Sequence, residues 1–192
     1  MTADGHFEVP RPTNEPVRPY GPDDPHRKSL KSRLAELTDA RTEVPMLIGG
    51  QPRWGASKGE LRSPHRRELT IAEHAIGGAK DIDDAIHAAL AARKMWAATS
   101  YAERAAVILR AAALLAGPWR DTINAATMLG QSKTVHQAEI DAACETVDFW
   151  RYNVHFGDQL LRQQPANDST AWNRLEYRPL EGFIFVVSPF NF

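Results

Sequence analysis

The sequence is poor in several features that would assign it to a specialised class of protein. Cys144 is the only cysteine among 192 residues, which excludes a disulfide framework and a CxxC metal site and fits a reducing, cytoplasmic setting. No apolar run approaches the roughly 20 residues that cross a bilayer, and no secretion signal is evident, so neither export nor membrane insertion is expected. Lysine and arginine total 23 against 24 acidic residues, which gives no electrostatic footprint for a nucleic acid or an anionic membrane.

What the sequence does contain is a globular composition, with 43% hydrophobic and 24% charged residues. Residues 1–26 are the exception, because they combine little apolar material with many prolines. These are Pro10, Pro12, Pro16, Pro19, Pro22 and Pro25. Such a segment is expected to be an extended arm that either lies on another surface or is disordered.

Apolar residues at helical spacing dominate the middle of the chain, from residue 81 to residue 163. Asp81 is the candidate N-cap of the first helix, and Ser100 with Glu103 forms a capping box that opens the second. Gly117 followed by proline ends that second helix. The pattern predicts a largely helical section with short connections.

The part before this section has a mixed pattern. Residues 27–38 have the spacing of a short amphipathic helix. Residues 46–48 and 51–54 are predicted to form a hairpin turned by the Gly49-Gly50 pair. A further short strand is predicted at 69–75. The chain is therefore expected to be an α/β protein with more helix than strand.

The longest helical pattern runs from Ser132 to about Gln163 and carries two apolar stripes. One stripe is Ile140, Ala143, Val147, Trp150 and Val154, and the other is Ala138, Ala142, Phe149, Tyr152 and Phe156. Two stripes predict a helix that is covered on two sides. Glu145 lies within the second stripe and places a carboxylate on a face that should be dry, so it is a candidate site residue.

The C-terminal stretch organises the prediction of the fold. Residues 183–187 form an unbroken apolar run, which is typical of a strand buried on both faces of a parallel sheet. Ligands bind beyond the carboxyl ends of such strands, where residues 188–191 fall. Residues 172–178 alternate as a half-exposed strand that another subunit could pair with. A central strand needs neighbours, and no comparable run precedes it, so we expect the front part of a longer protein.

Four blocks of residues carry a family resemblance. They are 130–134 (Gly-Gln-Ser-Lys-Thr), 137–143 (Gln-Ala-Glu-Ile-Asp-Ala-Ala), 148–153 (Asp-Phe-Trp-Arg-Tyr-Asn) and 186–192 (Val-Val-Ser-Pro-Phe-Asn-Phe). The last block resembles the strand and turn of the NAD(P)-dependent aldehyde dehydrogenase superfamily. The other three are similar to its 1-pyrroline-5-carboxylate dehydrogenase branch, also called L-glutamate γ-semialdehyde dehydrogenase. The resemblance runs from about residue 16 to the end.

The resemblance implies an enzyme of proline breakdown that oxidises L-glutamate γ-semialdehyde to glutamate with NAD. Family members attack the aldehyde with a cysteine thiolate, pass a hydride to NAD and release the acid with water activated by a glutamate. It also implies a homo-oligomer when complete, an oligomerisation strand at 172–178 and an incomplete NAD-binding domain at 27–192. The implied site residues are Asn191 at the oxyanion, Ser188, Pro189 and Phe190 at the cofactor, Phe192 at the substrate methylenes and Glu145 at its amino group.

The resemblance also leaves parts of the mechanism without residues in this chain. Family members place the cysteine nucleophile, the general-base glutamate and the glycine turn that binds the cofactor farther along than residue 192. The isolated chain is therefore expected to be inactive. Cys144 does not replace the nucleophile, because its mid-helix position favours a buried, inert thiol.

Several positions have a structural alternative. Asn191 follows a proline turn where asparagine often satisfies only local backbone groups, and Glu145 could instead form a structural ion pair. His136 and Glu139, three residues apart, lack a third metal ligand and are interpreted as a solvated face, so no metal is expected. The alternative from another class of function is a helical protein-interaction module: four amphipathic helices with a β-appendage and no catalysis.

Overall fold

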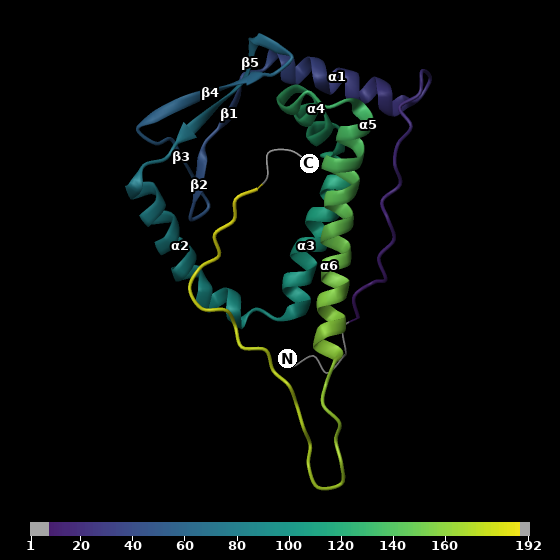
Figure 1. Ribbon diagram of the computed structural model, residues 1–192, viewed down its shortest axis with the longest axis vertical. Helices are drawn as coiled ribbons and strands as arrows, with labels where there is room; N and C mark the ends of the chain where they lie inside the picture. The colour runs from purple at the N-terminus through teal and green to yellow at the C-terminus, as the bar shows by residue number, and fades with distance from the viewer. Residues whose placement is uncertain (1–7, 189–192) are drawn as a thin grey trace.

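The computed structural model describes residues 8–188 and shows a helix-rich α/β chain (Figure 1). The helices are α1 (Pro25–Asp39), α2 (Ala79–Ala98), α3 (Tyr101–Ala116), α4 (Arg120–Gln131), α5 (Val135–Gln137), the π-helix η1 (Ala138–Cys144) and α6 (Glu145–Arg162). The strands are β1 (Thr42–Val44), β2 (Met46–Ile48), β3 (Gln51–Arg53), β4 (Ser57–Ser63) and β5 (Arg66–Ile76). The predicted α/β class, with more helix than strand, is confirmed.

Capping chemistry fixes where most helices begin. The predicted capping box is confirmed, because the Ser100 side chain accepts from the Glu103 amide and the Glu103 carboxylate accepts from the Ser100 amide. The predicted N-cap of α2 is wrong by three residues. Gly78 is the N-cap, and Asp81 lies one turn inside, where its carboxylate accepts the Gly78 amide at 2.9 Å. Asp81 therefore stabilises the start of α2 from the third helical position, where a negative charge is favourable.

The strands form two small sheets. β2 and β3 pair as the predicted hairpin, and Gly49 and Gly50 turn it with φ angles of 59° and 77°, which only glycine adopts without strain. A second sheet has the order β1-β5-β4, with β1 parallel and β4 antiparallel to β5. The sequence predicted only the central part of β5, because β4 is rich in charged residues and forms through pairing with β5.

The predicted long helix is a rod made of α5, η1 and α6 in succession. Ser132, with φ of 59°, ends α4, and Thr134 then caps α5 through a second capping box with Gln137. α6 lies alongside α3 (Figure 1), and the Tyr101 hydroxyl donates to the Val154 carbonyl between them. Ala143, Val147 and Val154 of the first predicted stripe are buried, as expected, but Ile140 of the same stripe is 41% exposed.

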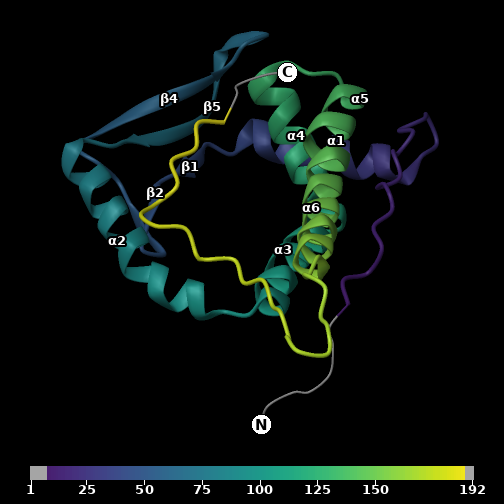
Figure 2. The same cartoon turned by 60° about the horizontal axis from the view of Figure 1, so that its bottom comes forward.

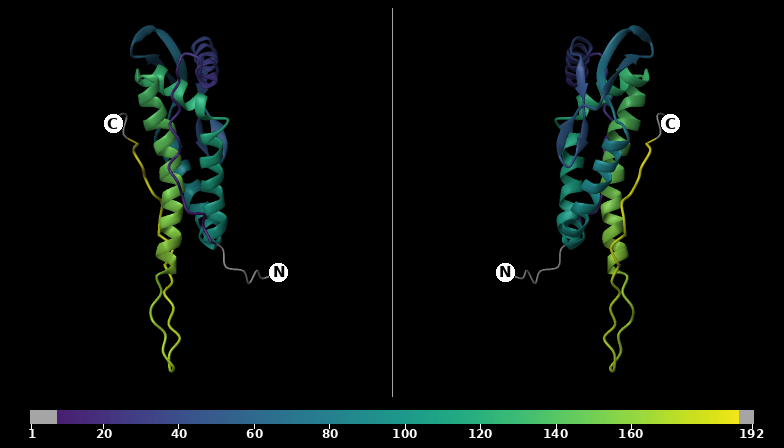
Figure 3. Two further views of the ribbon diagram at one scale, coloured as in Figure 1. Left: turned by 90° about the vertical axis from the view of Figure 1, so that its right-hand side faces the viewer. Right: turned by 90° about the vertical axis from the view of Figure 1, so that its left-hand side faces the viewer.

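The N-terminal arm, defined here as residues 8–24, is extended and lies against the helices of its own chain. Figures 1 and 3 show it running beside α6 before it enters α1. Val9 packs with Ala105 and Val154, and Tyr20 packs with Leu30 and Ala125. Of the two predicted alternatives for this segment, the structure therefore shows a bound arm.

The C-terminal segment, defined here as residues 163–188, leaves α6, makes a long excursion and returns past α2 (Figures 1 and 2). Its backbone contains no strand, so neither 172–178 nor 183–187 forms one among the described residues. Phe185 and Val187 are 80% and 76% exposed, and the expected burial is not met. A strand needs a partner to bond its backbone, and no described strand pairs with this segment.

No helix within residues 8–188 is both long enough and apolar enough to cross a membrane.

Candidate functional site

The structure places two of the six predicted site residues. Pro189, Phe190, Asn191 and Phe192 lie outside the described residues. Ser188 is exposed at the end of the C-terminal segment, and its hydroxyl makes no hydrogen bond to another residue between 8 and 188. Glu145 begins α6. The remaining geometry of the site is therefore built around Glu145.

Glu145 lies at the junction between the π-helix and α6. Its backbone N–H donates to the carbonyl of Ile140, five residues earlier, which is the last hydrogen bond of the π type. Its side chain is half-buried, and no hydrogen bond or ion pair joins its carboxylate to another residue in the described range. The structural alternative of an ion pair with an arginine thus finds no partner within residues 8–188.

The face of α6 that carries Glu145 is only partly covered by the described part of the chain, because Glu145 and Tyr152 are half-buried there. Phe149 and Phe156, from the second predicted stripe, are 58% and 50% exposed. The prediction of a helix covered on two sides is met only in part, because Val147 of the first stripe and Ala138 of the second are fully buried while Phe149 and Phe156 are not. A partly apolar face with one unpaired carboxylate is suited to an organic cation or to a further part of a polypeptide.

A second acidic residue, Glu139, is fully buried and was misinterpreted from the sequence as part of a solvated face. Its carboxylate accepts hydrogen bonds from two arginines, a tyrosine and an asparagine. The donors are the Arg18 amide at 2.7 Å, Tyr20 Oη at 2.9 Å, Asn124 Nδ2 at 2.8 Å, and Nε and Nη2 of Arg120. Arg120 is only 2% exposed. We call Tyr20, Arg120, Asn124, Glu139 and Cys144 the buried cluster.

Arg120 links the buried cluster to the N-terminal arm. Its guanidinium bonds Glu15 and donates to the Pro16 carbonyl at 2.7 Å. Glu15 also pairs with Arg151 of α6 at 2.7 Å. The arm, α4, the π-helix and α6 therefore meet at one set of charged groups, which satisfies the condition that buried charges be paired and hydrogen-bonded.

The electrostatics of the buried cluster follow from these contacts. Burial alone would raise the pKa of Glu139, but the hydrogen bonds from Arg120, the Arg18 amide, Asn124 and Tyr20 outweigh it and lower the pKa to about 2. Burial, and next the hydrogen bond and charge of Glu139, raise the pKa of Tyr20 to about 12. Glu139 and Arg120 are therefore both charged, and the Tyr20 hydroxyl is neutral, at neutral pH.

Cys144 is buried, as predicted. Burial raises the pKa of its thiol to about 11. The positive charge of Arg120 lowers this pKa, but the negative charges of Glu139 and other carboxylates oppose that effect. A thiol in this state is a poor nucleophile at neutral pH. The chain therefore offers no activated cysteine.

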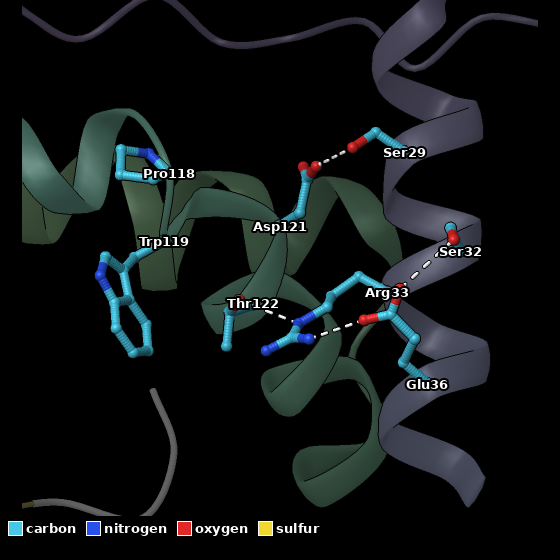
Figure 4. Close-up of a pocket in the computed structure, with 8 residues that line it drawn as sticks. All are labelled: Ser29, Ser32, Arg33, Glu36, Pro118, Trp119, Asp121 and Thr122. Atoms are coloured by element: carbon cyan, nitrogen blue, oxygen red, sulfur yellow. Dashed lines mark hydrogen bonds and ion pairs between the residues drawn. The ribbon is translucent and has the colours of Figure 1, made fainter. Parts of the chain in front are cut away.

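The hollow between α1 and α4 is a polar alternative site, and its volume is about 460 Å³ (Figure 4). Arg33 donates to Thr122 at 3.1 Å and pairs with Glu36 at 2.7 Å, and Ser29 donates to Asp121. Its polar groups mostly bond one another rather than point into the hollow. Within residues 8–188 no group of three or more histidine, cysteine or acidic side chains is arranged to hold a metal ion.

Comparison with known proteins identifies the class. Residues 54–192 match the model of the aldehyde dehydrogenase family, so the chain belongs to that family. Among curated relatives it is 39% identical to the probable delta-1-pyrroline-5-carboxylate dehydrogenase of Schizosaccharomyces pombe and 43% identical to the mitochondrial enzyme of Emericella nidulans. These matches cover 100% and 97% of this chain but 35% and 33% of the relatives, so the chain spans about a third of their length.

Solved structures give the same result. The Delta-pyrroline-5-carboxylate dehydrogenase from Mycobacterium tuberculosis bound with NAD is 49% identical and superposes with a TM-score of 0.97, over 99% of this chain and 36% of that one. A Thermus thermophilus 1-pyrroline-5-carboxylate dehydrogenase, 23% identical with a TM-score of 0.74, shares the fold. The resemblance inferred from the four sequence blocks is thus confirmed.

Proposed function

We propose that a longer polypeptide carrying this chain is an NAD-dependent dehydrogenase that oxidises L-glutamate γ-semialdehyde, the open form of 1-pyrroline-5-carboxylate, to glutamate. The observation that carries the proposal is the 49% identity, along almost the entire chain, to a delta-pyrroline-5-carboxylate dehydrogenase solved with NAD. The alternative of a non-catalytic helical module is supported by no feature of the described residues.

The residues of this chain would contribute binding and charge stabilisation. Asn191 would donate its side-chain amide to the negative charge that develops on the aldehyde oxygen, and a neutral amide does so without titrating. Glu145 would bind the ammonium group of the substrate, which its unpaired carboxylate supports. Phe192 would line the substrate methylenes.

NAD, when bound, accepts the hydride that leaves the substrate carbon. Ser188 has an exposed hydroxyl without a partner in the described range, and this fits a contact to a polar cofactor. Pro189 and Phe190 would line the same wall. The nucleophile has to come from outside these 192 residues, because the only thiol here, Cys144, is buried and protonated.

The assembly and the location are also proposals. The exposed alternating segment at 172–178 supports a homo-oligomer in which this segment pairs with another subunit. The single buried cysteine supports the cytoplasm, although the Emericella nidulans relative is named mitochondrial.

Kinetics of a full-length enzyme carrying this chain test the proposal, for instance after the chain is joined to the remaining part of the Mycobacterium tuberculosis relative. Asn191→Ala should lower kcat and kcat/KM together by about 100- to 1000-fold with every aldehyde, because the charge it binds appears only after attack. Glu145→Gln should mainly raise KM for glutamate semialdehyde and leave 5-oxopentanoate, which lacks the amino group, unaffected.

The 192-residue chain by itself should produce no NADH from glutamate semialdehyde. Saturable NADH production that disappears in Cys144→Ser would contradict the proposed division of the mechanism. Equal losses on both aldehydes for Glu145→Gln would remove Glu145 from the substrate site.

A further inference from the structure

The π-helix η1 separates the buried cluster from Glu145. A π turn contains one more residue than an α turn, is rare, occurs mostly as a single turn within an α-helix, and is frequent at functional sites. Here it covers Ala138–Cys144, and Glu145 is the residue that directly follows it. The position of the Glu145 side chain around the helix axis therefore depends on whether this turn is of the π type or the α type.

Arg120 contacts both ends of this turn. Its Nη2 atom donates to the carboxylate of Glu139 and, at 3.2 Å, to Sγ of Cys144, five residues later. In an α-helix, residues five apart point about 140° away from each other, so one guanidinium nitrogen would not reach both. Bonding between residues five apart, as in a π turn, brings the two side chains onto the same side. The contact of Arg120 with both Glu139 and Cys144 therefore depends on the π geometry of this turn.

The other hydrogen-bond donors to Glu139 come from outside the rod formed by α5, η1 and α6. Tyr20 and the Arg18 amide belong to the N-terminal arm, and Asn124 belongs to α4. Tyr20 is 3% exposed, Asn124 is fully buried, and Asn124 Nδ2 also donates to Tyr20 Oη at 3.0 Å. Glu139 is thus bound to a frame that would resist rotation of the helix. Buried ion pairs of this kind can specify one geometry even where they add little stability.

We propose that Glu139, held by Arg120 and the arm, is a positioning residue that keeps the π turn in place and so sets the direction of the Glu145 carboxylate. If the turn relaxed to α geometry, Glu145 and the start of α6 would rotate by about 100° relative to α5. The inference rests on the proposed function, because it assigns Glu145 to the ammonium group of the substrate.

Steady-state kinetics of the full-length enzyme with glutamate semialdehyde and with 5-oxopentanoate test this role. Glu139→Gln keeps the shape of the side chain but weakens its bonds to Arg120. It should raise KM for glutamate semialdehyde about 10-fold, with kcat and the KM for 5-oxopentanoate changed less than about 2-fold. Equal effects on both aldehydes, or no effect, would overturn the proposal.

Asp148→Asn is the matched control. Asp148 also binds the arm, through the Glu15 amide at 2.7 Å and Asn14 Nδ2 at 2.8 Å, but it lies beyond the π turn. It should leave the ratio of the two KM values unchanged. A shift in this ratio as large as that of Glu139→Gln would mean that docking of the arm, not the turn, is responsible, and would overturn the assignment.

Tyr20→Phe is the second variant, and it decides the test if Glu139→Gln does not fold. It removes one donor from the Glu139 carboxylate and keeps the pair with Arg120, so KM for glutamate semialdehyde should rise about 3-fold and that for 5-oxopentanoate should not. An unchanged KM ratio would then overturn the inference.

Glu145→Gln separates the two hypotheses. If it discriminates between the aldehydes and neither Glu139→Gln nor Tyr20→Phe does, the positioning role fails and the proposed function stands. If Glu145→Gln itself does not discriminate, the assignment of Glu145 fails first. A crystal structure of Glu139→Gln should show residues 138–144 in α geometry, and an unaltered π turn would count against the proposal.

Discussion

The chain has two long extended segments, and they differ in how far they are buried and in which groups bond their backbones. The N-terminal arm and the C-terminal segment both lack helix and strand from end to end. In the arm, Val9 and Tyr20 are each 3% exposed, whereas in the C-terminal segment Phe185 is 80% exposed. Extended backbone is therefore stable in this chain where side chains of the helices bond it.

The arm shows how such a segment is held without a sheet. Its backbone N–H groups at Glu15 and Arg18 donate to carboxylates of Asp148 and Glu139, and its Pro16 carbonyl accepts from Arg120. The C-terminal segment has one comparable contact to a helix, from Arg93 Nε to the Leu180 carbonyl at 3.0 Å. Charged side chains at fixed positions replace the missing strand partners of the arm, and the C-terminal segment has few such residues beside it.

Removal of the central arginine should have the largest effect on this difference. Arg120→Ala leaves the carboxylate of Glu139 buried without its ion pair, and it should lower the free energy of unfolding by about 3–5 kcal/mol. Arg33→Ala is the control, because Arg33 and Glu36 are paired at the surface, and it should cost about 1 kcal/mol or less. Urea unfolding of both variants measures this, and similar losses would contradict the central role of the buried cluster.

Acid should weaken the arm through the same carboxylate. The pKa of Glu139 falls from an ordinary 4.5 to about 2 in the folded chain, so its contribution to stability is complete above about pH 4.5 and is lost as pH falls toward 2. The melting temperature should decline over this range. Glu139→Gln should flatten that part of the profile, and an unchanged slope would contradict the assigned pKa.

A single hydrogen bond of the arm should matter less. Tyr20→Phe removes the donor to the Glu139 carboxylate and an acceptor of Asn124, which also bonds Glu139, and it should lower the free energy of unfolding by about 2 kcal/mol. Tyr177→Phe makes the same chemical change in the C-terminal segment, where Tyr177 is 57% exposed, and should have no measurable effect. Chemical denaturation of the pair checks this, and equal losses would mean that both segments are bound alike.

A substitution in the C-terminal segment should change the solubility of the chain and not its stability. Phe185→Ser changes a side chain that is 80% exposed, so unfolding should shift by less than about 0.5 kcal/mol while aggregation of the isolated chain decreases. Light scattering and thermal unfolding measure the two quantities. A large loss of stability would show that Phe185 is buried in solution.

The sequence predicted features whose physics is local. The glycine hairpin, the Ser100–Glu103 capping box and the buried stripe of α6 each depend on residues close together in the chain, and each was predicted. β4 was missed, because it has no strand pattern of its own and depends on β5.

The buried cluster was missed for a related reason. Glu139 looks like a surface residue, because its partner Arg120 is 19 residues earlier and Tyr20 is 119 residues earlier. No local sequence pattern predicts a π turn, so the inward orientation of the Glu139 side chain around the helix axis was not predictable either. Glu145 was selected as a candidate because a charge within an apolar stripe is a local signal, and its role also stays a prediction. The roles of Ser188, Pro189, Phe190, Asn191 and Phe192 came from the resemblance and stay predictions.

The arm also constrains the order of events during synthesis. It leaves the ribosome before the helices that bind it, because its partners Asp148 and Arg151 are 133 and 136 residues away from Glu15 along the chain. At about 5–20 residues per second, the arm waits on the order of ten seconds for the helix that binds it. Its low apolar content and its prolines suit a segment that must stay unpaired and soluble during this interval. The arm is thus made well before the helix that fixes it in place.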